Sequence, residues 1–108
     1  MKKILGTFAL LCCCQAHSAN NFYMMSNFEL WSNTYESEYI RVVDLAGVNN
    51  PESCADPDSY FVSTAISTDS QNRIYSTLMA AKLSQKTVQI VLNGCESTKP
   101  RIVNVILK

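Results

Sequence analysis

The chain has 108 residues, of which 47% are hydrophobic, and its nine basic and nine acidic side chains give a formal net charge of zero. This length suits one small domain and not two. A near-neutral charge argues against a nucleic-acid-binding surface, which is normally basic, so we expect no nucleic-acid partner.

The first 19 residues have the pattern of a cleaved secretory signal peptide. A basic start precedes an apolar run at residues 4–14, which is too short to span a bilayer as a helix. Small residues then allow cleavage after Ala16, Ser18 or Ala19. A membrane anchor and a lipoprotein signal are the alternatives. We therefore expect residues 20–108 to be the mature part of an exported bacterial protein, periplasmic or secreted, with no stable membrane insertion.

Cleavage would leave two of the five cysteines, Cys54 and Cys95, which are 95 − 54 = 41 positions apart. It would also remove two lysines, so that the mature net charge becomes 7 − 9 = −2. In a small exported domain, two cysteines favour one disulfide. A catalytic or metal-binding pair is the alternative, but the chain has no CxxC motif and its one histidine, His17, lies in the signal segment.

The mature chain begins with segments that resemble strands, because they are rich in β-branched and aromatic residues: residues 28–31, 39–45 and 60–64. Residues 20–27 ahead of them predict an irregular arm or a short edge strand. Residues 46–58 are rich in turn formers and predict a long loop that has little besides Cys54 to hold it.

Residues 68–84 have the spacing of an amphipathic helix. Thr68 and Gln71 suggest a capping box, and Asp69 places negative charge in the first turn, where the helix dipole favours it. The apolar stripe is expected to consist of Ile74, Leu78 and Ala81, widened by Tyr75, Met79 and Leu83.

Two further strands are predicted after the helix, at residues 87–92 and 101–107, with a tight turn at Asn93-Gly94. In the first strand, one face should carry Val88, Ile90 and Leu92. In the second, Val103, Val105 and Leu107 should share one face and Ile102, Asn104 and Ile106 the other.

The predicted order is therefore β-β-β-α-β-β, in an α+β or mostly-β fold. Five strands with one helix between the third and fourth is the outline of an oligonucleotide/oligosaccharide-binding (OB) barrel. In such a barrel the helix would plug one end with its apolar stripe. Other five-stranded α+β sheets fit the same order.

The C-terminal half carries a family resemblance in four short stretches: residues 77–82, 86–88, 94–95 and 100–107. These resemble small exported bacterial proteins that are similar in layout to the B subunits of subtilase-cytotoxin-like and pertussis-like AB5 toxins. The resemblance implies an OB-like barrel, assembly into a ring pentamer and binding of cell-surface glycans. It covers about half of the mature chain, and we carry over no binding residue from it.

Few residues offer catalytic chemistry, so we expect no enzyme, cofactor or metal. Nucleophilic catalysis needs a base, and the predicted mature chain has no histidine. A paired-carboxylate hydrolase is an alternative, but the spacing of the acidic residues does not converge: Glu36, Glu38, Asp44, Asp56, Asp58 and Asp69. Asp56 and Asp58 with Glu52 could supply calcium ligands, although a polar turn is the simpler interpretation.

The N-terminal quarter offers the better candidate for a binding surface. Trp31, Tyr35 and Tyr39, with Phe22 and Tyr23 before them, alternate with asparagine and serine. An aromatic face under a sugar ring, with polar side chains bonded to its hydroxyls, is a chemically suitable glycan site. The same aromatics could instead fill the core or a subunit interface.

Three functions are therefore open from the sequence. The first is a glycan-binding, B-subunit-like module, which would be a homo-oligomer. The second is a stand-alone interaction module with a protein ligand, such as an inhibitor, an immunity-type protein or an envelope-stress protein. The third is a small exported enzyme.

Overall fold

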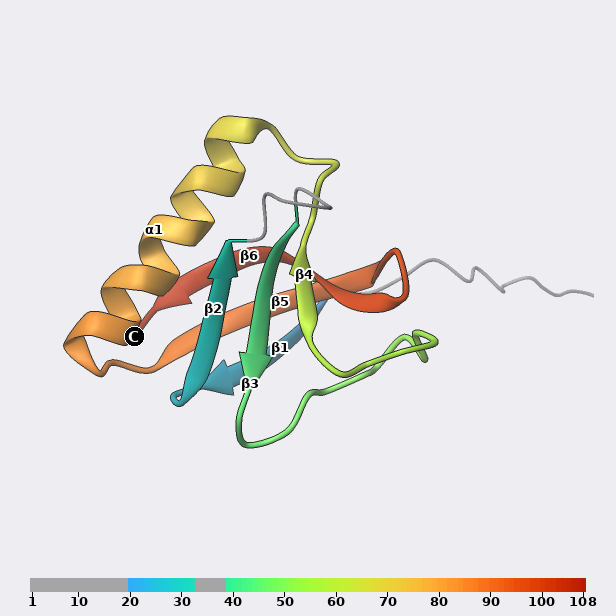
Figure 1. Ribbon diagram of the computed structural model, residues 1–108, viewed down its shortest axis with the longest axis horizontal. Coiled ribbons are helices and arrows are strands. Elements are labelled where there is room, and N and C mark those ends of the chain that lie inside the picture. The colour runs from blue at the N-terminus through green and yellow to red at the C-terminus, as the bar shows by residue number, and fades with distance from the viewer. Residues whose placement is uncertain (1–19, 33–38) are drawn as a thin grey trace, which may run out of the picture.

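The computed structural model describes residues 20–32 and 39–108, so the predicted signal segment and Tyr35 lie outside the described residues. The described chain forms one helix and six strands (Figure 1). In chain order these are β1 Asn21–Met25, β2 Phe28–Ser32, β3 Ile40–Asp44, β4 Tyr60–Val62, α1 Thr68–Ser84, β5 Val88–Glu96 and β6 Lys99–Leu107.

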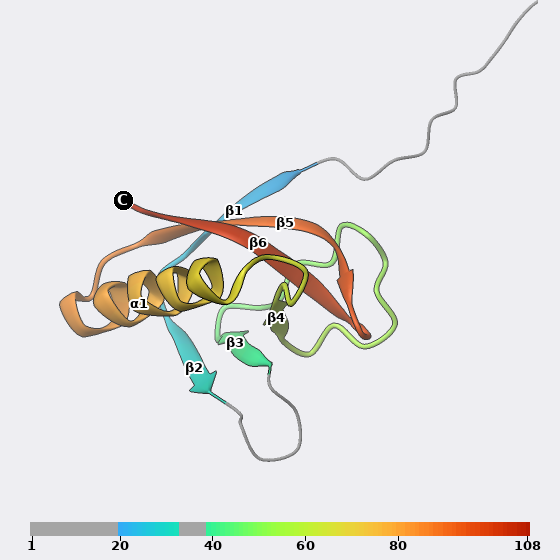
Figure 2. The same cartoon turned by 90° about the horizontal axis from the view of Figure 1, so that it is seen from above.

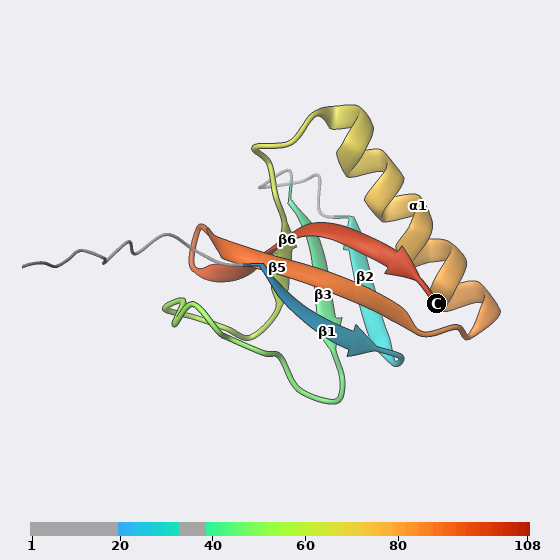
Figure 3. The ribbon, with the colours of Figure 1, turned by 180° about the vertical axis from the view of Figure 1, so that it is seen from behind.

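All six strands belong to one sheet, with the order β1-β5-β6-β4-β3-β2. Every pairing is antiparallel except that of β4 with β6, which is parallel. The expected mostly-β domain with one helix is confirmed, but the expected five strands are corrected to six. The described pairings form an open sheet, with β1 and β2 at its two edges (Figure 3).

The additional strand is β1, in the segment for which the sequence left an arm or an edge strand open. It pairs with β5 from Asn21 opposite Leu92 to Met25 opposite Val88. Met25 is buried, whereas Phe22 and Met24 are exposed. The side chains therefore alternate between core and solvent, as expected for an edge strand with one buried face.

The core lies between the two halves of a strongly bent sheet. Seen from above, β1 and β5 lie on one side and β2 and β3 on the other, with α1 beside them (Figure 2). Every strand and the helix contribute buried side chains to one cluster: Met25, Phe28, Val42, Tyr60, Val62, Ile74, Leu78, Ala81, Val88, Ile90, Leu92 and Ile102.

Helix α1 buries the predicted stripe of Ile74, Leu78 and Ala81. Its N-cap is Ser67, whose Oγ accepts a hydrogen bond from the Ser70 N–H, so the predicted capping box at Thr68 is wrong. A serine before the first turn satisfies a free N–H as well as a threonine one position later would.

The C-terminal end of α1 is fixed to an edge strand. Lys82 Nζ donates to the Phe28 carbonyl oxygen of β2 at 2.7 Å. Leu83, expected to widen the apolar stripe, is instead 78% exposed. Within the described residues, no helix is long and apolar enough to cross a membrane.

The hairpin of β5 and β6 differs from its prediction at the turn. Asn93-Gly94 lies within β5 at a register break between Leu92 and Cys95, and the chain reverses after Glu96, which is opposite Lys99. An Asn-Gly pair suits a tight turn, but a glycine with positive φ also suits a bulge. Gly94 has a φ of +74°, and a Cβ there would lie 2.5 Å from the Arg101 guanidinium.

A second register break changes the faces of β6. Val91 is opposite Asn104, whereas Leu92 is opposite Ile102, so Val103 is the extra residue. Ile102 is fully buried and Val105 packs against the same core, although the sequence placed them on opposite faces. The bulge shifts the alternation by one residue, which strict periodicity cannot predict.

The loop between β3 and β4 is held at several points. The predicted disulfide between Cys54 and Cys95 is confirmed, with the two Cα atoms 5.8 Å apart. The buried Tyr60 hydroxyl accepts from the Asn49 N–H at 2.8 Å, and the Asn50 side chain bonds both the N–H and the carbonyl oxygen of Cys54. The expectation that little else holds this loop is therefore wrong.

We predict that removing the disulfide strongly destabilises the domain. Its sequence separation of 41 residues corresponds to about 4 kcal/mol on the chain-entropy model. Thermal unfolding of the Cys54→Ser/Cys95→Ser variant should therefore begin at a much lower temperature than that of the oxidised wild type. Dithiothreitol should destabilise the wild type and leave the variant unchanged. A wild type insensitive to reduction would contradict the prediction.

Gly94→Ala should cost about 1–2 kcal/mol of unfolding free energy, because alanine is strained at positive φ and would displace Arg101. Gly47→Ala is the matched control. Gly47 also has a positive φ, +121°, but no atom lies within 4 Å of a Cβ placed there. Urea unfolding should show a smaller cost for Gly94→Ala in an Arg101→Ala background. An equal cost in both backgrounds would show that contact with Arg101 is unimportant.

Candidate ligand-binding face

Four side chains lie in one line across the sheet. Trp31 of β2 is opposite Arg41 of β3, Arg41 is opposite Phe61 of β4, and Phe61 is opposite Arg101 of β6. Directly paired residues point to the same face of a sheet. We call these four residues the outer row. The neighbours of the outer row along each strand include the buried Val42, Tyr60, Val62 and Ile102, so the row faces away from the core.

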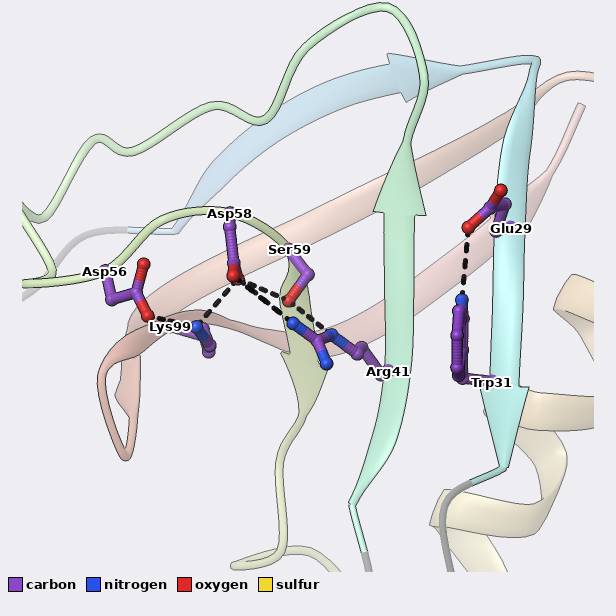
Figure 4. Close-up of polar contacts among 7 residues, drawn as sticks. All are labelled: Glu29, Trp31, Arg41, Asp56, Asp58, Ser59 and Lys99. Atoms are coloured by element: carbon purple, nitrogen blue, oxygen red, sulfur yellow. Dashed lines mark hydrogen bonds and ion pairs between the residues drawn. The ribbon is translucent and has the colours of Figure 1, made fainter.

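Trp31 is the exposed aromatic ring of the outer row. The residue is 51% exposed, and its Nε1 donates to Glu29 Oε1 on the same strand at 3.2 Å. This bond fixes the ring while leaving much of its apolar surface in solvent (Figure 4). The alternative that Trp31 fills the core is therefore excluded. Its predicted role in ligand binding stays a prediction.

Tyr39 is close to the outer row through a ring contact. Its ring stacks on Phe61 with centroids 4.4 Å apart and an interplanar angle of 2°. Both side chains are half-buried. Phe61 was not among the predicted site residues, although its place between the inward Tyr60 and Val62 indicated an outward position. The structure therefore places Trp31 on β2 and Tyr39 immediately before the neighbouring strand β3.

An ionic cluster adjoins the outer row on the side away from Trp31. The Lys99 side chain is only 8% exposed, and its Nζ lies 2.6 Å from Asp56 Oδ2 and 2.7 Å from Asp58 Oδ1 (Figure 4). Lys99 is held there by the hairpin turn, since the Thr98 carbonyl oxygen accepts from the Asp56 N–H at 2.9 Å. A buried ammonium needs such partners to offset the loss of water.

Arg41 connects this cluster to the aromatic rings. Its Nη2 lies 3.3 Å from Asp58 Oδ2, and its Nε donates to Ser59 Oγ at 2.9 Å. The Ser59 hydroxyl in turn donates to Asp58 Oδ1 at 3.0 Å. Arg41 Cζ and Lys99 Nζ each lie 6.0 Å from the centroid of the Phe61 ring. Asp58 therefore has hydrogen-bond or ionic contacts with three neighbouring side chains.

These contacts keep both signs of charge present at neutral pH. The hydrogen bond from Lys99 is the largest influence on Asp58 and, with Ser59 and Arg41, holds the pKa of that carboxyl below its usual value despite partial desolvation. Burial by itself would lower the pKa of Lys99, but Asp56 and Asp58 outweigh it, so that this pKa is raised.

The cluster also bears on the calcium alternative. Asp56 and Asp58 do converge, but on the Lys99 ammonium. Among residues 20–32 and 39–108, no three His, Cys, Asp or Glu side chains are grouped as metal ligands. The other carboxylates are dispersed: Asp44 accepts from the Ala46 N–H, and Asp69 pairs with Arg73 on the helix surface. Glu36 and Glu38 lie outside the described residues.

A separate groove of about 340 Å³ lies between α1 and β6. It does not coincide with the outer row. The described residues that line it include no aromatic ring: Ile66, Ser70, Arg73, Ile74, Thr77, Val103, Asn104 and Val105. Its one cation, Arg73, pairs with Asp69 at 3.1 Å and is largely exposed. The outer row has the more distinctive combination of side chains, because it joins aromatic rings to fixed charges.

Comparisons with models of protein families, with curated proteins and with solved structures found no match. The resemblance of the C-terminal half to toxin B subunits stays a prediction.

The ionic cluster predicts acid sensitivity. Because folding lowers the pKa of Asp58 below its ordinary value of 3.8, its stabilising contribution is complete above about pH 4 and is lost as the pH falls through the lower folded pKa. Urea unfolding of wild type and Asp58→Asn should therefore differ by about 1 kcal/mol at pH 7, since the carboxylate is half-exposed, and by much less at pH 2.

Asp69→Asn is the control for this measurement, because Asp69 is an exposed carboxylate whose pair with Arg73 lies on the helix surface. Its effect on unfolding should be small at both pH values. A difference for Asp58→Asn that stays constant from pH 7 to pH 2 would contradict the assigned cause.

Proposed function

We propose that this chain is an exported, non-enzymatic binding module that recognises glycans through the outer row and the neighbouring Tyr39 and Asp58. One observation carries the proposal: an exposed Trp31 ring, hydrogen-bonded to Glu29, shares a sheet face with Arg41, which contacts the half-exposed Asp58 carboxylate that Lys99 also holds. This combination suits a sugar, which has an apolar ring face and a rim of hydroxyl groups.

The chemistry of each side chain supports this role. The Trp31 ring can pack against the C–H face of a sugar at reduced entropic cost, because its hydrogen bond to Glu29 already restricts its orientation. Carboxylates accept hydrogen bonds only, and sugar hydroxyls donate them. Arg41 of β3 lies between Trp31 of β2 and Asp58, which is in the loop just before β4. A ligand that contacts both must therefore cross about two strand spacings, roughly 10 Å, which favours an oligosaccharide over a single sugar.

We also infer that the bent sheet is an OB-like barrel. Traced through the pairings, β1 and β2 run in the same direction, and only Ser26 and Asn27 separate them. The chain from Asn21 to Ser32 thus pairs first with β5 and then with β3. One bent strand that pairs with both ends of a sheet is a way to close a barrel. Helix α1, with its three buried residues, would cover one end.

The edges of the sheet support a homo-oligomer. The exposed Phe22 and Met24 of β1 are large apolar side chains on a strand that has one neighbour among the described strands, β5. Exposed edges of this kind are commonly paired or covered. Pairing of β1 in one copy with a different edge in the next would be head-to-tail, which generates a ring when the rotation closes. The toxin-B-subunit resemblance makes a pentamer the proposed size.

Two features support export. Residues 1–19 have the pattern of a secretory signal peptide. The Cys54–Cys95 disulfide is typical of small domains in oxidising compartments. We propose a periplasmic or secreted location.

The second candidate function is a stand-alone module that binds a protein. The exposed β1 edge favours it, because a protein partner could add a strand there and cover Phe22 and Met24. This candidate and the first differ in the surface used: the β1 edge for a protein, the outer row for a glycan.

We predict that Trp31→Ala lowers glycan affinity by about tenfold or more, because stacked aromatic contacts contribute on the order of 1–2 kcal/mol. The measurement is a glycan array with the disulfide-bonded protein lacking the signal segment, followed by calorimetric titration of the best glycan. Leu83→Ala, which removes another exposed apolar side chain, should bind like wild type.

Light scattering of the same sample gives the native mass. A ring would have a mass about five times that of the mature chain, whereas a monomer that binds no glycan on the array would favour the protein-binding candidate.

A further inference from the structure

We infer that the outer row selects uncharged oligosaccharides and discriminates against acidic ones. This inference rests on the proposed glycan function and specifies its ligand class. It comes from the exposed fraction of each charged side chain on this face. The net charge of the chain does not reveal this difference.

The carboxylates of the face are more exposed than its cations. The side chains of Asp56 and Asp58 are 60% and 52% exposed, whereas those of Lys99 and Arg41 are 8% and 33% exposed. Glu29, beside the Trp31 ring, is also exposed. A ligand approaching from solvent therefore meets negative charge first, at both ends of the path from Trp31 to Asp58.

The cations are also occupied by contacts within the protein. Lys99 Nζ is bonded to two carboxylates, and Arg41 contacts Asp58 and Ser59. Arg101, the last member of the outer row, donates from Nε to the Asn93 carbonyl oxygen at 2.8 Å and packs over Gly94. An acidic sugar that took the place of Asp58 at Arg41 Nη2 would leave that carboxylate without one of its partners.

Uncharged sugars have no such conflict. Their hydroxyls can donate to the exposed oxygens of Asp56, Asp58 and Glu29 in charge-assisted hydrogen bonds, which are stronger than neutral ones. A carboxylate or sulfate on the sugar would lie near these three charges and be repelled, and salt would screen that repulsion. The fixed carboxylates thus act as acceptors for neutral ligands and as a barrier to anionic ones.

The test compares matched oligosaccharides that differ in one charge. A neutral galactose-terminated oligosaccharide and the same molecule extended by sialic acid would be titrated against the wild-type protein at 50 mM and 500 mM salt. We expect at least about tenfold tighter binding of the neutral ligand at low salt, and a smaller ratio at high salt.

Variants identify the charges responsible. Asp58→Asn should weaken binding of the neutral ligand and reduce the selectivity ratio. Glu29→Gln keeps an oxygen acceptor for Trp31 Nε1 and lies outside the ionic cluster, so it should reduce the ratio even if Asp58→Asn does not fold. Asp69→Asn removes an exposed charge from the helix and should leave the ratio unchanged.

The outcomes separate the two proposals. Equal or tighter binding of the sialylated ligand would overturn the inference about charge and leave glycan recognition intact. A selectivity ratio unaffected by Glu29→Gln and by any folded Asp58 variant would also overturn it. Binding of neither ligand, and of no other glycan on the array, would overturn the proposed function itself.

Discussion

The two register breaks in the β5–β6 hairpin are the constraint on which the shape of the domain depends. At Asn93-Gly94 and at Val103 the ladder gains an unpaired residue, first on one strand and then on the other. Bulges increase local twist and bend a sheet. Because β5 and β6 are the longest strands and lie next to each other within the sheet, their bend brings the outer strands around one core. Without it, a six-stranded sheet this small would expose one whole face to water.

The same hairpin organises the loop that follows β3. Its turn presents Lys99 to the loop carboxylates, its strand provides Cys95 for the disulfide, and its Thr98 carbonyl accepts the Asp56 N–H. A loop with few buried apolar side chains gains little from hydrophobic burial, so these polar and covalent contacts decide its position. The position of Asp58 beside Arg41 thus depends on the contacts that the preceding loop residues, Cys54 and Asp56, make with the β5–β6 hairpin.

The parts of the fold that could be predicted from the sequence are those set by local periodicity. The Ile74-Leu78-Ala81 stripe repeats at helical spacing, and Val88, Ile90 and Leu92 alternate as a strand should, and the structure confirms both. What was missed depends on partners distant in the chain. Asn93-Gly94 has the same local preference in a bulge as in a turn, and a lysine such as Lys99 is normally solvent-exposed until loop carboxylates surround it. Of the candidate face, Trp31 and Tyr39 were therefore predicted, whereas Phe61 and the ionic residues were not.

The disulfide also divides the chain topologically. Cys54 and Cys95 enclose a covalent ring that contains β4, α1 and most of β5, while β1 to β3 precede the ring and β6 follows it. The ring includes exposed segments in which a protease could cut, such as residues 55–58 before β4. A single cut there opens the ring without releasing a fragment, because the cystine still joins both pieces. An oxidised domain built in this way tolerates a backbone nick that would separate its halves if the thiols were reduced.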